Sequence, residues 1–261
     1  MTLLQWILLF SFLGGALSVM AAGLFLLLPE KTRGRLLPHA VSFAIGALLG
    51  AALLGLLPHA LETVQDGDFH TITGAVLLGL FGFFVLEKLV LWRHCHHEHC
   101  EIHQPDTGHH VNPAAGTLIL IGDSLHNFID GILIAAAFLT DVHLGIVTAL
   151  AVAAHEIPQE VGDFAVLLHS GFSTSRAFMF NLLSSLATVV GGVLAYYSLS
   201  ELQPFLPYVL AVAASSFIYV AVADLIPGLH KRAEFSATLK QMLLIGAGVG
   251  LIYLTHSTLH S

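Results

Sequence analysis

The sequence predicts an all-α polytopic membrane protein with eight transmembrane helices. Of its 261 residues, 56% are hydrophobic and only 10% are charged, whereas a soluble domain carries about 25% charged residues. The mean hydropathy is +0.84. Apolar stretches of about 20 residues recur from one end of the chain to the other, and each can cross about 30 Å of hydrocarbon as a helix. Basic residues occur only in or beside every second joint between these stretches.

Polar joints divide the chain into eight apolar blocks. The joints are PEKTRGR, ETVQDGDFH, a His-rich stretch at 94–112, TDVH, HSGFSTSR, SELQPFLP and HKRAEFSATLK. The blocks predict transmembrane spans at 4–28, 36–60, 70–93, 115–139, 144–168, 173–199, 205–228 and 238–259. They leave no room for a second soluble domain, so we expect one transmembrane domain over 1–261. The N-terminal MTLLQWILLF lacks a basic n-region and a cleavage site, which favours a first span over a removed signal peptide.

The distribution of charge tests this span count and orients the helices. The basic residues are Lys31, Arg33, Arg35, Lys88, Arg93, Arg176, Lys231, Arg232 and Lys240. All nine lie in or beside alternate loops, and the other loops contain only acidic charges. By the positive-inside rule the basic loops face the cytoplasm, which places both termini outside. We expect the lipid bilayer of a plasma or inner membrane as surroundings, and no nucleic-acid partner.

Spans four and five each carry a polar cluster at the centre. Side chains four residues apart on a helix share a face, and both clusters are built from such pairs. The pairs are His126–Asp130, Asp123–Asn127, His155–Gln159 and Glu156–Glu160, with Asp163 next along span five. The two predicted spans have their centres at Asn127 and Glu156. Two helices therefore bring groups that can bind metal to the same depth.

Placing these carboxylates at the middle of a membrane is unfavourable in free energy. One Asp near a helix centre costs about 2.5–3.5 kcal/mol, so five carboxylates on two helices approach roughly 10 kcal/mol before water and protonation relieve the cost. No basic residue lies at that depth, which leaves protons, water or a cation to neutralise them. Imidazole with carboxylate suits Zn²⁺, Fe²⁺, Mn²⁺ or Cd²⁺, whereas Ca²⁺ and Mg²⁺ favour all-oxygen sites. The absence of Cys and Met from both clusters argues against Cu⁺.

Three functions compete for this cluster: metal transport, an intramembrane metallohydrolase, and a metal sensor without transport. A zinc protease needs H-E-x-x-H on one helix face, with Glu as general base. In HEIPQEVGD the fifth position is Gln159, and Pro158 removes the hydrogen bond to the carbonyl of Ala154. We therefore favour transport, and expect no enzyme activity, catalytic residue or resident cofactor.

At these residues the chain resembles the ZIP family of divalent metal transporters. The matching segments are HNFIDG in span four, HEIPQEVGDF in span five, LLPHA ending span two, the His-rich loop, and PYVLAVAASSFIYVAVADLIP in span seven. The resemblance implies eight spans, outward termini and entry of metal into the cytoplasm through a two-metal centre. It implies Zn²⁺ as the substrate, with Cd²⁺, Fe²⁺ and Mn²⁺ as alternatives. A homodimer is an expectation from the family alone.

The resemblance also assigns ligands by position. The primary site corresponds to His126, Asp130, His155 and Gln159. The second site corresponds to Asn127 and Glu156, with Asp130 or Gln159 as a bridge. Glu160 matches the second acid of an H-E-x-P-H-E variant of the span-five motif.

Three positions depart from the family pattern. Gln159 stands where that variant has His. Ala51 and Gly55 stand where many members have Asp and His in span two, and Thr188 is the nearest equivalent of a span-six Glu. Fewer anionic ligands should weaken the second site, so both a one-metal and a two-metal centre remain open.

Accessory metal ligands are expected at three places along the chain. They are Asp123 and Asp163 beside the centre, His59 near the outer surface, and His94, His96, His97 and His99 in the cytoplasmic loop. His-rich tracts are weakly specific metal binders, so the loop either captures delivered metal or is simply solvated. His59 suits entrance binding and interfacial anchoring equally. Asp224, near the end of span seven, could join an exit path or cap a neighbouring helix, and the cap is favoured.

Overall fold

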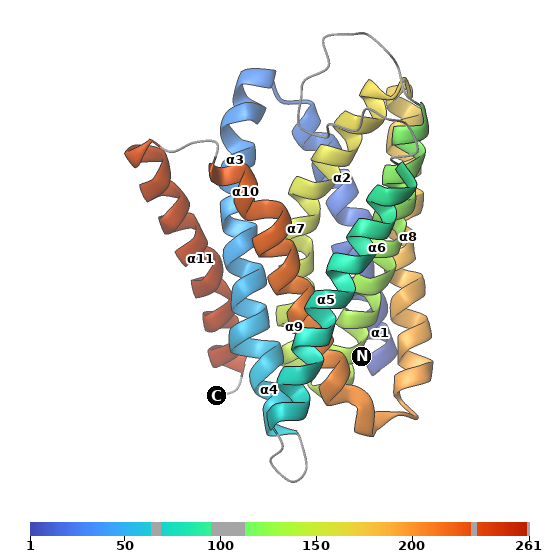
Figure 1. Ribbon diagram of the computed structural model, residues 1–261, viewed down its shortest axis with the longest axis vertical. Helices are drawn as coiled ribbons and strands as arrows, with labels where there is room; N and C mark the ends of the chain where they lie inside the picture. Colours follow the sequence, from blue (N-terminus) through green and yellow to red (C-terminus); the bar gives the residue numbers. More distant parts are fainter. Residues whose placement is uncertain (64–68, 95–112, 231–233, 260–261) are drawn as a thin grey trace.

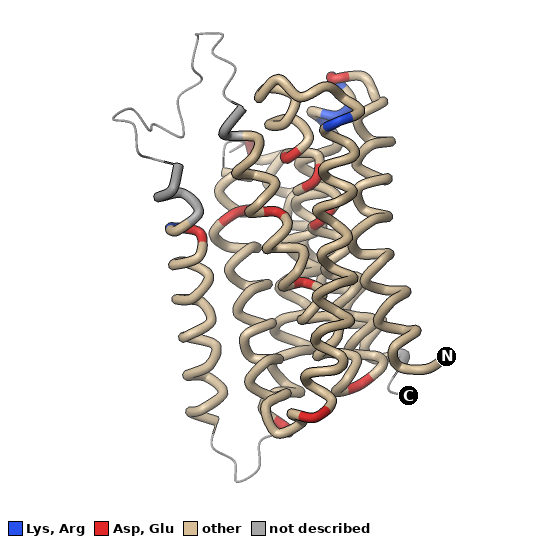
Figure 2. The backbone as a smooth tube through the Cα atoms, turned by 90° about the vertical axis from the view of Figure 1, so that its right-hand side faces the viewer, with Lys and Arg blue, Asp and Glu red and all other residues tan. Residues whose placement is uncertain are grey.

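The computed structural model describes residues 1–63, 69–94, 113–230 and 234–259, which form one bundle of long, roughly parallel helices (Figure 1). All regular secondary structure in these ranges is helical, which confirms the predicted all-α class. Both ends of the chain lie toward the lower end of the bundle in Figure 1. The described Lys and Arg residues gather toward the opposite end (Figure 2). The described basic residues and the two chain ends thus lie at opposite ends of the bundle, and which end faces the cytoplasm stays a prediction.

Eight helical segments correspond one to one to the predicted spans. In chain order they are α1 (Leu3–Gly14) with α2 (Ala16–Leu26); α3 (Glu30–Gly50), η1 (Ala51–Leu56) and α4 (Leu57–Glu62); α5 (Phe69–His94); α6 (Pro113–Thr140); α7 (Val142–His169); α8 (Thr174–Leu199); η3 (Gln203–Phe205), α9 (Leu206–Tyr219), η4 (Val220–Leu225) and α10 (Ile226–His230); and α11 (Phe235–Leu259). Seven segments of the described chain are long and apolar enough to cross a membrane. The eighth, α7, is 28 residues long, and its polar residues lower its hydropathy.

Local sequence signals set the ends of α7. Asp141 is its N-cap, and the Asp141 carboxylate accepts hydrogen bonds from the backbone N–H groups of His143 and Leu144 at 2.8 and 2.9 Å. Such a cap satisfies N–H groups that have no partner within the helix. Beyond its C-terminal end, Gly171 adopts φ 85° in the turn to α8, a conformation that favours glycine. These two signals fix where the central helix of the bundle starts and stops.

Two glycines bring α6 and α8 into very close contact. A Cβ atom added to Gly131 of α6 would lie 1.9 Å from the carbonyl oxygen of Thr188. One added to Gly191 of α8 would lie 2.1 Å from the carbonyl oxygen of Phe128. Small residues allow helix backbones to approach in lipid, where packing drives association. The approach holds the polar face of α8 against the polar cluster of α6.

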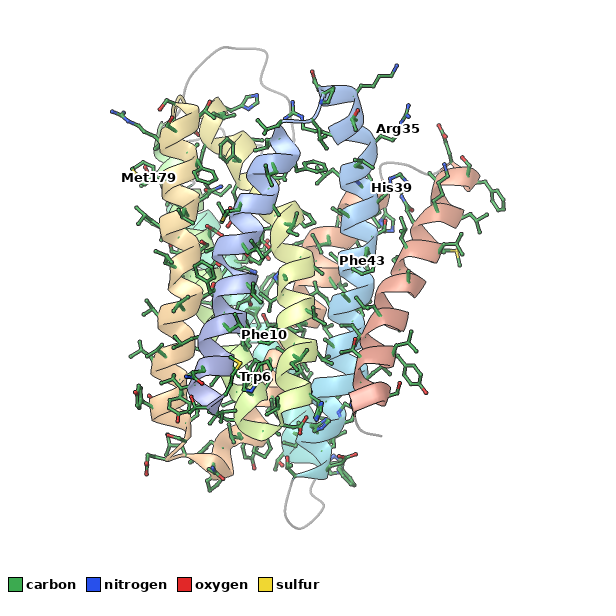
Figure 3. The ribbon with its side chains drawn as sticks, turned by 180° about the vertical axis from the view of Figure 1, so that it is seen from behind. Trp6, Phe10, Arg35, His39, Phe43 and Met179 are labelled. Atoms are coloured by element: carbon green, nitrogen blue, oxygen red, sulfur yellow. The ribbon has the colours of Figure 1, made fainter. Side chains whose placement is uncertain are left out.

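Aromatic side chains of α1 and α6 pack together in the half of the bundle nearest the termini. Trp6 and Phe10 of α1 stack near Phe138 of α6, with ring centroids 6.4 and 5.5 Å from the Phe138 ring, and Figure 3 shows both α1 rings toward that end. Phe138 and Leu144 are almost fully buried. Spans two and seven each contain a π-helical segment, η1 and η4. η1 packs against α9, and η4 packs against α3.

Candidate metal centre

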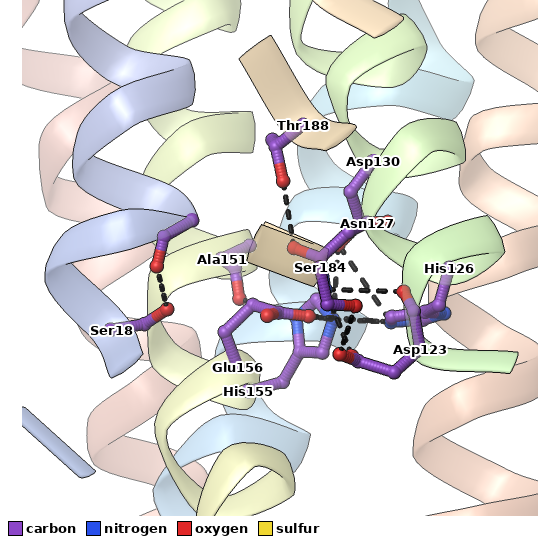
Figure 4. Close-up of polar contacts among 11 residues, drawn as sticks. Ser18, Asp123, His126, Asn127, Asp130, Ala151, His155, Glu156, Ser184 and Thr188 are labelled. Carbon is purple, nitrogen blue, oxygen red and sulfur yellow. Dashed lines mark hydrogen bonds and ion pairs between the residues drawn. The ribbon is translucent and has the colours of Figure 1, made fainter. Parts of the chain in front are cut away.

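Antiparallel helices α6 and α7 bring two imidazoles and two carboxylates together at the middle of the bundle (Figure 4). We call His126, Asp130, His155 and Glu156 the quartet. One ligand atom from each lies within 4.8 Å of the other three. The Nε2 atoms of the two histidines are 3.2 Å apart. Asp130 Oδ2 lies 3.3 Å from His155 Nε2 and 3.8 Å from His126 Nε2. Glu156 Oε1 lies 3.6 Å from His126 Nε2 and 3.8 Å from His155 Nε2.

This spacing fits a small metal ion. Ligand atoms around a tetrahedral Zn²⁺ with bonds of about 2.0–2.1 Å are about 3.3 Å apart, close to the observed separations. The Nδ1–H of His155 donates to the carbonyl oxygen of Ala151 at 3.0 Å. Metal-binding histidines commonly make such a bond, which orients the ring and leaves Nε2 as the ligand. The nitrogen and oxygen lone pairs of the quartet are therefore close enough together to coordinate one metal ion.

The quartet is buried and lacks a basic partner. Asp130, His155 and Glu156 are each 1% exposed, and the His126 side chain is 20% exposed. Within the described residues, the carboxylate oxygens of Asp130 and Glu156 have no hydrogen-bond partner, and their close contacts to nitrogen are with the two histidines alone. Charged groups away from water need a partner or a cation. The arrangement is therefore suited to receive a divalent cation.

Three carboxylates form a second group beside the quartet. Oxygen atoms of Asp123, Glu156 and Glu160 lie within 4.8 Å of one another, so Glu156 belongs to both groups. Asn127, the expected second-site ligand, is fully buried and already hydrogen-bonded. Its Nδ2 donates to Asp123 Oδ1 at 2.9 Å, and its Oδ1 accepts from Thr188 Oγ1 at 2.7 Å.

Helix α8 supplies hydrogen-bond partners that the sequence did not identify. Ser184 Oγ donates to Asp123 Oδ2 at 2.5 Å, and the hydroxyl of Thr188 holds Asn127 (Figure 4). Thr188 was noted only as a position without an acid. The available signal was the spacing of Ser184 and Thr188, which are four residues apart in α8, so that both hydroxyls lie on one face.

A cavity of about 440 Å³ opens beside the quartet. Its lining includes His126 of α6, Gln159 and Asp163 of α7, Glu87 of α5, and Tyr219 and Asp224 of span seven. The Tyr219 hydroxyl donates to the Glu87 carboxylate. Asp224 lies within η4 and lines this cavity, and its role in an exit path or as a cap stays a prediction. The lining residues include four carboxylates and no Lys or Arg.

The remaining expected ligands lie elsewhere. His59 is in α4 at the end nearest the termini, and its ring centroid lies 5.5 Å from that of His256 in α11. It is therefore remote from the quartet. His96, His97 and His99 lie outside the described residues, as does the side chain of His94.

Comparisons with known proteins place the chain in a family. A model described as the ZIP zinc transporter matches residues 3–117 and 92–256. The human protein named zinc transporter ZIP4 is 32% identical over 270 residues, covering 80% of this chain and 41% of that protein. ZIP13 of Pongo abelii is 30% identical over 230 residues, covering 84% and 66%. The chain thus spans less than two thirds of these two relatives, and on the match to the family model it belongs to the ZIP zinc transporter family.

Proposed function

We propose that this chain transports zinc, as a divalent cation, across the membrane into the cytoplasm through the quartet. The observation that carries the proposal is the meeting of His126, Asp130, His155 and Glu156 in the interior, where no Lys or Arg of the described residues neutralises the carboxylates. The relatives named zinc transporters support the choice of ion. Because that family is a class of transporters, its match also supports the expectation that the chain is not an enzyme.

The chemistry of the quartet favours zinc among common divalent ions. Two borderline imidazole nitrogens and two hard carboxylate oxygens give a mixed set, which suits Zn²⁺ better than Mg²⁺ or Ca²⁺, since these two ions prefer all-oxygen ligands. The two carboxylates neutralise the charge of one divalent ion. The alternatives Cd²⁺, Fe²⁺ and Mn²⁺ compete for the same ligands, so the order of preference is part of the proposal's test.

The surroundings of the quartet support release toward the cytoplasm. The cavity beside His126 extends toward the end of the bundle where the basic residues gather. Toward the termini, the aromatic cluster of Trp6, Phe10 and Phe138 and the buried Leu144 occupy the interior. The conformation is therefore one in which metal leaves on the predicted cytoplasmic side, and the plasma or inner membrane is the proposed location.

The test is zinc entry into proteoliposomes that contain a trapped zinc-sensitive dye. The native chain is compared with Asp130→Asn, which removes one charge from the quartet with little change of shape. Glu201→Gln, at an exposed position between α8 and η3, is the matched control because it also neutralises one carboxylate. We expect uptake by the native chain and the control, and none by Asp130→Asn. Uptake at the native rate by Asp130→Asn would contradict the site assignment.

A further inference from the structure

The cavity beside the quartet is larger than the passage of a metal ion requires, and much of its wall is apolar. Its volume is about 440 Å³, within the range of about 300–1,000 Å³ that holds small organic molecules. Burying an apolar molecule against such a wall is favourable, whereas a hydrated ion gains nothing from it. The apolar side chains that line the cavity include Phe83 and Leu86 of α5, Leu118, Leu125 and Ile129 of α6, and Val220 of η4.

Two of these lining side chains are also exposed at the surface of the bundle, one on α5 and one on α6. Leu86 is 45% exposed and Leu125 is 49% exposed. Both belong to helices that are long and apolar enough to cross a membrane. The cavity is therefore open between α5 and α6 at membrane depth, and a hydrophobic molecule dissolved in the lipid can enter it from the side.

Aromatic rings and carboxylates lie together in one part of the lining. The ring centroids of Phe83 and Tyr219 are 6.4 Å apart, with the planes tilted by 32°. The Tyr219 hydroxyl donates a hydrogen bond to the Glu87 carboxylate. Asp224 follows Tyr219 by five residues in span seven, and its carboxylate is close enough to that of Glu87 for the two negative charges to repel each other. We call Phe83, Glu87, Tyr219 and Asp224 the aromatic–acidic set.

Rings and carboxylates in this combination recognise organic ammonium groups. A ring face attracts a cation that lies within about 6 Å of its centroid. The Glu87 carboxylate accepts one hydrogen bond from Tyr219 and keeps lone pairs for an ammonium N–H, which would make a charge-assisted bond. Among the described residues that line the cavity, none is Lys or Arg. Lys88, the next residue of α5, lies over the ring of Phe84 instead, with its Nζ 5.8 Å from the centroid.

We propose that this cavity binds a hydrophobic monoamine, with its ammonium group at the aromatic–acidic set and its apolar body along the wall formed by α5 and α6. An alkylamine with a pKa near that of Lys, about 10.4, is charged at neutral pH. Because the cavity adjoins His126, the bound molecule would stand between the quartet and the predicted cytoplasmic side and block the release of zinc. This blocking rests on the proposed function, whereas the binding of the amine does not.

The test is the binding of phenylbutylamine to the full-length chain in phosphatidylcholine nanodiscs, without metal. A ligand of the folded chain raises the midpoint of thermal unfolding in a saturable way. Phenylbutanol has the same apolar body without the charge, and Glu87→Gln removes the opposite charge with little change of shape. Glu62→Gln, at the exposed end of α4, is the matched control. We expect the amine to bind the native chain and the control equally, and Glu87→Gln about 10- to 100-fold more weakly.

A second pair of variants tests the apolar end of the cavity. Leu118→Trp places a larger ring in the space that the phenyl group would occupy, so we expect it to abolish amine binding. Leu78→Trp is its control, because Leu78 is 74% exposed on α5 and lies outside the lining. Asp224→Asn takes the place of Glu87→Gln if that variant does not give a monodisperse protein. Equal affinities for the amine and the alcohol, or for the native chain and Glu87→Gln, would overturn the inference.

Zinc uptake into proteoliposomes is measured separately, with and without phenylbutylamine. We expect the amine to slow uptake by the native chain over the same concentration range in which it binds. Amine binding to a chain that takes up no zinc would refute the proposed function and leave this inference standing. Zinc uptake at the full rate while the amine is bound would overturn the blocking role.

Discussion

The contact between α6 and α8 gives a prediction in which one methyl group should disturb the metal centre. In Gly131→Ala the new Cβ would lie 1.9 Å from the carbonyl oxygen of Thr188, a backbone atom that cannot rotate away. The helices must separate by about 1.5 Å or more to restore an ordinary contact. The hydrogen bonds from Ser184 to Asp123 and from Thr188 to Asn127, now 2.5 and 2.7 Å, would then break.

The expected loss of stability follows from these terms. Overpacking of this kind costs about 1–3 kcal/mol. Interhelical hydrogen bonds in membrane proteins average about 0.6 kcal/mol each. Replacing a helical Gly by Ala stabilises the helix by about 0.5–1 kcal/mol, because Ala has the higher helix propensity. We expect Gly131→Ala to destabilise the protein by about 2–3 kcal/mol, since the steric term exceeds the gain in propensity.

Gly162→Ala is the matched control for this substitution. Gly162 lies within α7, and an added Cβ would have no atom within 4 Å. Only the propensity term then operates, so we expect this variant to be as stable as the native chain or about 0.5–1 kcal/mol more stable. Both variants are compared by thermal unfolding in detergent, with zinc binding as a second readout. Equal stability of Gly131→Ala and Gly162→Ala would show that the close contact does not hold α6 against α8.

Two further substitutions test the polar centre. Thr188→Val should reduce the free energy of unfolding by about 0.6–1.7 kcal/mol, because it leaves the buried oxygen of Asn127 without its donor. Thr188→Ser keeps the hydroxyl, so in the same unfolding assay it should avoid most of this loss. His155→Ala should weaken zinc binding by more than about 100-fold, since changes to outer-shell partners alone cost about 10- to 100-fold. His169→Ala is its control, because His169 also lies in α7 with Nδ1 bonded to a backbone carbonyl, at Ala165, but is outside the quartet. Dye-competition titrations that give both histidine variants the same affinity would remove His155 from the site.

The spans were predictable because each must satisfy the bilayer independently of its neighbours. An apolar block of sufficient length is required wherever the backbone crosses hydrocarbon, and the observed helices overlap all eight predicted spans. The interruptions within spans were not predictable. Helix α1 ends at Gly14 and α2 starts at Ala16, and a Cβ on the intervening Gly15 would lie 2.5 Å from the carbonyl oxygen of Ser185. That contact depends on the position of α8, which no local pattern contains.

The residues of the candidate metal centre could be predicted to lie near one another, but their geometry could not. Spacing of four residues pairs His126 with Asp130 and His155 with Gln159. In the structure Glu156 joins the two histidines, while Gln159 faces the cavity. His155 and Glu156 are neighbours on adjacent strips of α7, and the rotation of α7 about its axis decides which strip faces α6. This rotation is set by packing against the surrounding helices, including α1, α2, α3 and α8.

The absence of a basic residue connects the stability of this centre to its proposed activity. A Lys or Arg beside Asp130 and Glu156 would neutralise them permanently, and a buried ion pair of that kind would occupy the position of the metal. Without it, a cation that binds the folded chain stabilises it by mass action, and a cation that leaves exposes buried carboxylates to one another again.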